Sequence, residues 1–313
     1  PVRFVVVSDT HGFERDLQLP DRDDGVDCLL HCGDFLMEGG TGNEDSTKDL
    51  CGWLHTLRYQ WMFLIGGNHD QPIQDEVCRE EPPREWPDNA LLLQSPIPGE
   101  RWQSIASGSV APHIRDGAVR LSGPGLNLSR PDQDSGAGFV ISGSGMSLAN
   151  SSWSASRAFQ MDRSKETERR EACQGLLRYA PAIVMTHGPP KGFFDEGRGD
   201  EILAGQLNDC SSVLMHVFGH SHTPGVDVTK KKSALATVNA SMNDRFYFAG
   251  NWPVIFDMDL GPARPPGLDT VEAAVPESGP LLSPRQRDAA TSSGMPAMYS
   301  EGSPPQKIHK IDK

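Results

Sequence analysis

Acidic, imidazole and amide side chains recur in five short motifs of this chain. The motifs are Asp9-Thr10-His11, Gly33-Asp34, Gly66-Gly67-Asn68-His69-Asp70, Thr186-His187 and Gly219-His220-Ser221-His222. Carboxylate, imidazole and amide groups without thiolates favour ions such as Zn, Mn, Fe or Co over Ca. Each motif taken alone also fits an ordinary turn or strand end, because such short matches are common. The five together predict a metal site.

The spacing within these motifs indicates how two ions would be shared. Asp9 and His11 are two residues apart, so in an extended chain both side chains would face the same way and ligate one ion. The pair His220 and His222 repeats this spacing. Asp34 follows a glycine and is placed to bridge two ions. A shared carboxylate suits ions roughly 3.5–4 Å apart, which lower the pKa of a bridging water and clamp a phosphoryl group.

The third motif also contains candidate catalytic residues. His69 is a candidate general acid, and we expect Asp70 to orient it by accepting its other N–H. Asn68 offers an amide oxygen to a metal, although a turn with a capping Asn is the alternative. His31 and His216 alternate with apolar residues on predicted strands, so we expect them to be packed core histidines.

The elements that must position these motifs form an α/β pattern. Apolar strands are predicted over 3–8, 27–31 and 61–65, with a helix over 46–58 between the second and third. A strand, a crossover helix and a strand imply a parallel sheet. Further strands are predicted at 90–94, 139–142, 182–185, 213–218, 236–240 and 253–258. A further helix is predicted to begin after Ser164 as its N-cap. Each metal-type motif therefore follows a predicted strand, where open α/β sheets bind ligands.

The remaining segments give little regular signal. Residues 71–90 are polar, and residues 95–138 are read as an irregular insert rich in Gly, Pro and Ser. From residue 261 the chain is rich in proline and almost lacks aromatic residues, which predicts a disordered tail over 261–313. We therefore expect one domain over 1–260, followed by that tail.

Composition narrows the classes of partner. With 313 residues and a hydrophobic content of 37%, the chain can form a sizeable core, and its formal net charge is -13. An acidic surface disfavours stable nucleic-acid binding and anionic membranes. No apolar run approaches a membrane span, and no signal segment or disulfide framework is visible. A cytoplasmic location is the expectation, and the oligomeric state is not predicted.

The order of the five motifs resembles that of the calcineurin-like metallophosphoesterase superfamily. The resemblance spans roughly residues 2 to 258. Within it, the stretches at 185–193, 216–220, 238–241 and 253–257 are similar to the brain-expressed class III cyclic nucleotide phosphodiesterase-like branch of metallophosphoesterase-domain-containing proteins. The resemblance implies a sandwich of two mixed β-sheets flanked by helices. Members of that branch often carry Glu where this chain has Asp70, and some lack the histidine found here as His220.

The resemblance also implies roles for the motif residues. Asp9, His11 and His222 would hold one ion, and Asn68, His187 and His220 the other. Asp34 would bridge the two, and His69 would protonate the leaving oxygen with support from Asp70. The implied activity is metal-dependent hydrolysis of a small phosphodiester, with a cyclic nucleotide as a candidate, by attack of a hydroxide bridging two divalent ions. A phosphomonoesterase or protein phosphatase is the alternative, and a non-catalytic scaffold is a third hypothesis.

Overall fold

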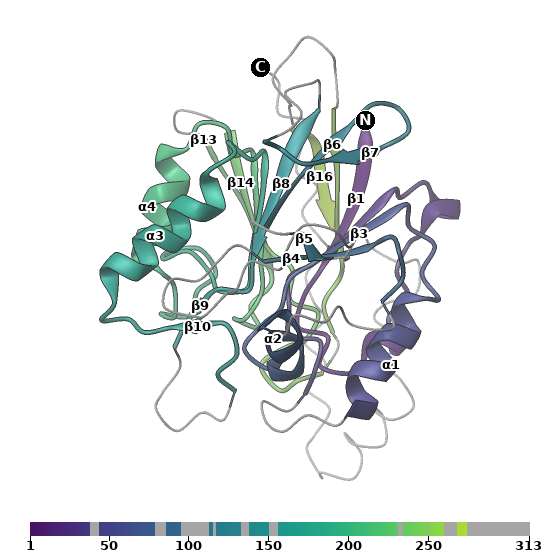
Figure 1. Ribbon diagram of the computed structural model, residues 1–313, viewed down its shortest axis with the longest axis horizontal. Helices are drawn as coiled ribbons and strands as arrows, with labels where there is room; N and C mark the ends of the chain where they lie inside the picture. The colour runs from purple at the N-terminus through teal and green to yellow at the C-terminus, as the bar shows by residue number, and fades with distance from the viewer. Residues whose placement is uncertain are drawn as a thin grey trace.

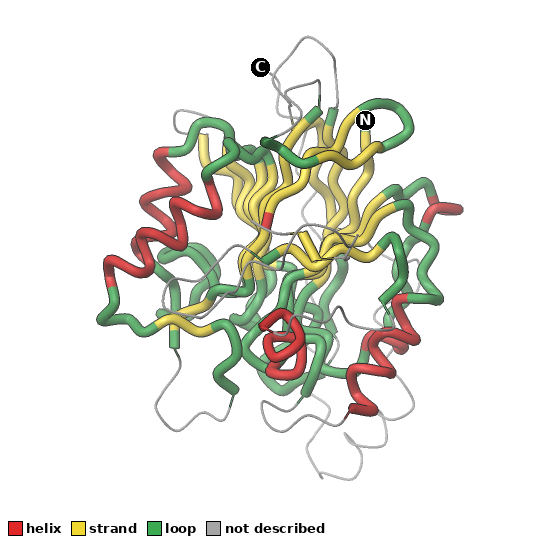
Figure 2. Tube along the Cα trace, viewed as in Figure 1, coloured by secondary structure: helices red, strands yellow, loops and turns green. Residues whose placement is uncertain are grey.

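The computed structural model describes residues 1–37, 44–78, 86–94, 113–114, 117–132, 138–149, 156–230, 234–248, 250–259 and 268–273. Over these ranges, two seven-stranded sheets pack face to face and helices cover their outer faces (Figures 1 and 2). The predicted fold class, two mixed sheets packed as a sandwich flanked by helices, is confirmed.

The first sheet contains the N-terminal strands. Its order is β16 (Leu268–Ala273), β15 (Val254–Met258), β1 (Val2–Val7), β2 (Cys28–His31), β3 (Trp61–Leu64), β4 (Ala90–Leu93) and β5 (His113–Ile114). Strands β1 to β5 run parallel to one another, whereas β15 is antiparallel to both β1 and β16. The parallel arrangement predicted for the first three strands is confirmed.

The second sheet is also parallel at its centre. Its order is β13 (Gly225–Lys230), β14 (Ala234–Asn239), β12 (Met215–Phe218), β11 (Ile183–Thr186), β8 (Phe139–Ser144), β6 (Ala118–Ser122) and β7 (Asn127–Ser129). Strands β14, β12, β11 and β8 are parallel, and the outer strands join them in antiparallel pairs. A small separate pair is formed by β9 (Ser147–Leu148) and β10 (Gln160–Met161).

Aromatic and aliphatic side chains fill the space between the two sheets. The ring of Phe4 on β1 stacks on Phe256 of β15, with 5.0 Å between centroids, and lies 6.0 Å from Phe139 on β8 of the other sheet. Leu30 and Ile183 belong to the same fully buried cluster. These strands are buried on both faces, as their uninterrupted apolar sequences predict.

Among the described residues, four helices cover the outer faces of the sheets. These are α1 (Glu44–Leu54), α2 (Gln71–Cys78), α3 (Glu166–Leu177) and α4 (Glu201–Asp209). Helices α3 and α4 lie side by side along the second sheet (Figure 1). Leu50 and Trp53 of α1 and Leu176 of α3 point into a second buried cluster with the outward-facing strand residues. Short 3-10 turns occur at Glu14–Asp16 and Arg22–Asp24.

Several predicted boundaries require correction. Helix α1 ends at Leu54, earlier than predicted, and the Thr56 hydroxyl donates to the Trp53 carbonyl just beyond it. Ser164 is not an N-cap, because its hydroxyl donates to the Asp162 carboxylate at 2.8 Å, and Lys165 precedes the helix. The stretch 71–90 contains α2, whose Pro72 lies in the first turn, where a missing N–H is tolerated.

The predicted insert and tail are also only partly irregular. Within 95–138, strands β5, β6 and β7 join the sheets. Residues 268–273 form β16, which pairs with β15, so the expected disorder does not hold there. The other tail residues, 261–267 and 274–313, lie outside the described residues.

Candidate metal centre

All seven predicted metal ligands lie together beyond the carboxyl ends of five strands. Strands β1, β2 and β3 of the first sheet lead to Asp9 and His11, to Asp34, and to Asn68. Strands β11 and β12 of the second sheet lead to His187, and to His220 and His222. Three overlapping groups of donor atoms form there: Asp9 with His11 and His222, His11 with Asp34 and His69, and Asp34 with His187 and His220. Both sheets therefore contribute to one centre.

In the first group, two imidazole nitrogens face each other. The Nε2 atoms of His11 and His222 are 3.4 Å apart, and His222 Nε2 lies 3.4 Å from Asp9 Oδ1. The Nδ1 atom of His11 donates to the Leu36 carbonyl at 3.0 Å, and that of His222 donates to the Asp244 carbonyl at 2.9 Å. When both rings are neutral, with the proton on Nδ1, the two Nε2 lone pairs point at each other. A cation between them fits this arrangement, and carbonyl partners of this kind orient metal-ligating histidines.

The second group is built around Asn68. Its Oδ1 lies 3.0 Å from His187 Nε2 and 2.7 Å from His220 Nδ1. His187 Nδ1 donates to the Cys32 carbonyl at 2.8 Å, so its Nε2 presents a lone pair to the amide oxygen when the ring is neutral. Two acceptors this close require a proton or a cation between them. The residues of both groups therefore fit bound divalent ions.

Asp34 connects the two groups. Its Oδ2 atom lies 3.2 Å from His187 Nε2 and 3.8 Å from His11 Nε2, while Oδ1 accepts from the His69 backbone N–H at 2.8 Å. One carboxylate oxygen thus faces a ligand of each group. This position fits the predicted bridging carboxylate.

Charge interactions keep both carboxylates ionised. Burial raises the pKa of Asp9, but a hydrogen bond with His222 and the charge of His187 outweigh it and hold that pKa at about 2. Burial opposes ionisation of Asp34 too, and His187 nevertheless holds its pKa well below the usual value. Burial lowers the pKa of His187, but Asp34 raises it to about 9. Neighbouring histidines thus favour the ionised form of each carboxylate.

The backbone at the centre is left-handed, not extended. Of the ten non-glycine residues with positive φ among those described, four are predicted ligands: Asp9 (53°), His11 (47°), Asp34 (55°) and His220 (67°). The expectation that Asp9 and His11 align through extended spacing is therefore wrong, because turns bring them to the centre. Asp, Asn and His tolerate this region better than other residues, yet each such position still costs of order 1–3 kcal/mol.

Two glycines allow the strands to approach the carboxylates closely. A Cβ atom on Gly67 would collide with the Asp34 carboxylate and with the His187 ring. A Cβ atom on Gly219 would collide with Ser8 and with the Asp9 carboxylate. The Gly-Asn-His and Gly-His-Ser-His motifs therefore need glycine for space.

The structure contradicts the predicted partnership of His69 and Asp70. The Asp70 carboxylate is fully buried and accepts four backbone N–H groups, from Asp34 (2.8 Å), Phe35 (3.3 Å), Leu36 (3.0 Å) and Gly67 (2.8 Å). His69 Nδ1 instead faces the Met37 carbonyl at 2.9 Å and the Ser156 hydroxyl at 3.3 Å. Consecutive residues of this turn point in different directions, so Asp70 positions the Asp34 turn and not the His69 ring.

The two histidines assigned to the core are packed there. His31 stacks on Phe35 with 3.8 Å between ring centroids, and His216 stacks on Phe218 at 5.3 Å. Both are fully buried, and burial lowers the pKa of each to about 3. They are neutral at ordinary pH.

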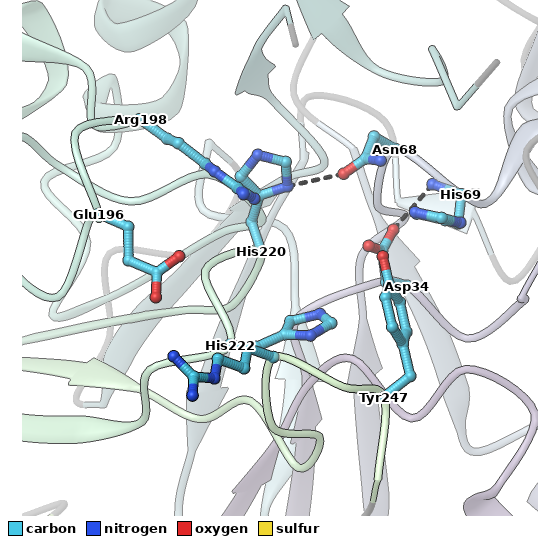
Figure 3. A pocket seen from close by; sticks show the side chains of 9 residues that line it. Asp34, Asn68, His69, Glu196, Arg198, His220, His222 and Tyr247 are labelled. Atoms are coloured by element: carbon cyan, nitrogen blue, oxygen red, sulfur yellow. Dashed lines mark hydrogen bonds between the residues drawn. The ribbon is translucent and has the colours of Figure 1, made fainter. Parts of the chain in front are cut away.

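A cavity of ≈ 210 Å³ opens beside the centre (Figure 3). Its walls include predicted site residues and four side chains that sequence reasoning missed, Glu196, Arg198, Arg245 and Tyr247. The Tyr247 ring packs edge-on against His11 at 4.9 Å and His222 at 4.8 Å. These four residues lie on loops without metal-type motifs. The one signal in the sequence is the adjacent aromatic pair Phe246-Tyr247, and the structure leaves both residues exposed.

A comparison with protein-family models matches residues 2–224 to the calcineurin-like phosphoesterase model. The chain belongs to the calcineurin-like phosphoesterase family. Human metallophosphoesterase domain-containing protein 1 is 28% identical over 265 residues, which are 82% of this chain and 71% of the human protein. The UPF0046 protein T07D4.2 of Caenorhabditis elegans is 26% identical over 275 residues, 83% of this chain and 61% of that protein. The predicted superfamily and branch are thus confirmed.

A solved structure agrees with the fold of this phosphoesterase. The protein TT1561 of Thermus thermophilus superposes with a TM-score of 0.50 over 82% of this chain and 94% of that one, at 15% identity. Family membership and the clustered candidate ligands make the chain a metal-dependent phosphoesterase acting on a small substrate. Among the helices described, none has the length and apolar character needed to cross a membrane.

Proposed function

We propose that this phosphoesterase is a two-metal phosphodiesterase acting on a small diester, with a cyclic nucleotide as a candidate. The observation that carries the proposal is the pair of donor groups joined by Asp34 at the cavity wall. Asp9, His11 and His222 would hold one ion, and Asn68, His187 and His220 the other. Mn, Fe, Zn and Co all suit this donor set. The branch resemblance supports a diester, and the ≈ 210 Å³ cavity favours a small one.

Two divalent ions held there would lower the pKa of a water and neutralise phosphoryl oxygens. The chain's own residues orient the reaction. The Met37 carbonyl accepts from His69 Nδ1, which leaves Nε2 as the nitrogen that can carry a proton to the leaving oxygen. His69 lines the cavity, so it is placed to act on a bound ester. Protonation matters most for an alkoxide leaving group, as in a nucleotide diester.

A phosphomonoesterase remains the second candidate because two arginines, Arg198 and Arg245, also line the cavity. Guanidinium groups bind phosphate with forked hydrogen bonds, and a monoester dianion could use them. This candidate predicts that p-nitrophenyl phosphate is hydrolysed faster than its diester counterpart.

The test compares bis-p-nitrophenyl phosphate with p-nitrophenyl phosphate on chelator-stripped protein resupplied with Mn, Fe, Zn or Co. We expect no turnover without metal, a preference for the diester with metal, and loss of activity in Asp34→Ala. The control Asp132→Ala, on an exposed carboxylate paired with Arg130, should retain activity. Absence of turnover with every ion would refute the proposal. If the pure protein also bound no ion, the hypothesis of a non-catalytic scaffold would be supported.

A further inference from the structure

Two arginines reach the candidate metal centre from separate loops. Arg198 lies on the loop between β11 and α4, and Arg245 lies on the loop between β14 and β15. Both line the cavity together with His220 and His222. Within the described part of the chain, neither guanidinium forms an ion pair with a carboxylate. Two unpaired positive groups at one cavity are unusual in a chain of formal net charge -13.

The loop that carries Arg198 is held in place by its own hydrogen bonds. The Asp195 carboxylate accepts from the backbone N–H groups of Gly192 (3.1 Å) and Gly197 (3.3 Å). Arg163 donates to the Arg198 carbonyl at 3.2 Å, so the backbone is anchored beside the guanidinium. The Ser221 hydroxyl, next to His220, donates to the Phe194 carbonyl. The loop is therefore preorganised against the centre.

The loop that carries Arg245 is attached directly to a predicted ligand. The Asp244 carbonyl accepts from His222 Nδ1 at 2.9 Å, and its carboxylate accepts from the N–H groups of Phe246 (2.8 Å) and Phe248 (3.1 Å). The Arg245 guanidinium lies over the Phe246 ring at 4.8 Å from its centroid. A cation–π contact of this kind limits the positions that the guanidinium can take.

The surroundings leave the two positive charges available to a ligand. The one carboxylate that shares the cavity wall on this side, Glu196, accepts from the Thr223 hydroxyl. Figure 3 shows Arg198 and Glu196 on the side of the cavity opposite His69. Arg198 therefore faces the part of an ester that is retained, not the leaving group.

We infer that Arg198 and Arg245 form a subsite for a second phosphate on the retained part of the substrate. Two guanidinium forks can share the three free oxygens of a terminal phosphate, whereas a carboxylate offers only two oxygens. The reacting phosphoryl group belongs at the donors around Asp34 and Asn68, so the arginines serve a separate charge. This inference rests on the proposed phosphodiesterase function and narrows its substrates to diesters that carry a further phosphate, so a cyclic nucleotide would need a second phosphate to use the subsite.

A matched pair of substrates tests the subsite. Thymidine 5′-(p-nitrophenyl phosphate) and its 3′-phosphorylated form differ only by the second phosphate. For the Mn-loaded full chain we expect kcat/KM to be at least roughly tenfold higher for the 3′-phosphorylated diester, the size of one charge-assisted contact. Arg198→Ala and Arg245→Ala should each remove most of this preference, because each should lower kcat/KM for the 3′-phosphorylated diester more than for the plain diester. Arg170→Ala, an exposed arginine on α3, is the matched control and should keep the preference.

Binding separates this inference from the proposed function. Calorimetry should show that thymidine 3′,5′-bisphosphate binds the Mn-loaded protein more tightly than thymidine 5′-phosphate, and that both arginine variants abolish the difference. If neither diester is hydrolysed but this difference is found, the subsite stands and the phosphodiesterase proposal fails. Equal binding of the two nucleotides, or a preference that survives in both variants, would overturn the subsite. A matched fall in kcat for both diesters would also overturn it, because the arginines would then act on the reacting phosphoryl group.

Discussion

Replacing Asp70 by Asn tests whether this residue positions the metal-site turn. The carboxylate accepts four backbone N–H groups: Oδ2 from Asp34, Phe35 and Gly67, and Oδ1 from Leu36. Asn keeps one acceptor oxygen. If that oxygen takes the place of Oδ2, the new amide N–H₂ faces the Leu36 N–H, and two buried donors oppose each other.

The expected cost follows from these two unsatisfied donors. A buried donor without a partner costs about 1–3 kcal/mol, so Asp70→Asn should lower the free energy of unfolding by about 2–5 kcal/mol. For a folded body of this size, that corresponds to a fall in Tm of roughly 4–20 °C. The measurement is thermal unfolding of chelator-stripped protein. The matched control Asp75→Asn, on an exposed carboxylate of α2, should stay within about 0.5 kcal/mol of the wild type.

A specific pair of results would refute this reasoning. If Asp70→Asn unfolded at the wild-type temperature but shifted the acidic limb of the activity profile, Asp70 would act through His69, as the sequence alone predicted. The structure predicts the opposite pattern. Stability and metal retention should fall, because Asp34 loses the anchor of its left-handed turn.

Two other buried charges give further predictions. Glu14 is buried, and its Oε2 atom has no hydrogen-bond partner. Burial raises the pKa of Glu14 from 4.5 to about 6. The protonated side chain therefore stabilises the fold below pH 4.5, and this contribution is lost as the pH rises through 6. Urea unfolding at pH 8 and pH 4.5 gives the free energy of unfolding of Glu14→Gln minus that of the wild type. This difference should be about 2 kcal/mol more favourable to the variant at pH 8. Equal differences at the two pH values would contradict the prediction. Arg169 is 4% exposed and donates to Asp200 at 2.9 Å, so Arg169→Met should cost about 3–5 kcal/mol by leaving a buried carboxylate unpaired. Adding Asp200→Asn, which keeps an N-cap oxygen on α4, should recover part of that loss in the same assay. If the losses of the two single variants simply added in the double variant, the Arg169–Asp200 interaction would not contribute to stability.

The strands were predictable because the apolar residues within each strand indicate that it is buried. Val2–Val7 and Cys28–His31 are apolar on both faces, and short runs of this kind usually form central strands of a sheet. Strands β6 and β7 were missed because they are the two outermost strands on one side of the second sheet. There the half-buried Arg120 and the exposed Asn127 interrupt the apolar run. Helix α2 was missed because only Ile73 of its first five residues is buried.

The candidate site was predictable in its residue types and not in its geometry. Asp9 and His220 could be picked out because their chemistry is visible in the motif, whereas their left-handed backbone is set by neighbouring strands. The Asp70 side chain was assigned to His69 by adjacency alone, although its four partners come from two separate turns. Arg198 and Arg245 gave no local signal, because only the tertiary fold brings their loops to one cavity.

The position of β1 between β2 and β15 has a consequence during synthesis on the ribosome. Arg3 on β1 pairs with Asp257 on β15, 254 residues later, with donor–acceptor distances of 2.7 and 2.9 Å. At about 5–20 residues per second, translation needs roughly 10–50 s to deliver that partner. During this interval, one edge of the strand that leads to Asp9 and His11 lacks its neighbour and can pair with other nascent chains. Slow translation or a truncated message would therefore expose the N-terminal half of this protein to aggregation before its metal-binding residues are assembled.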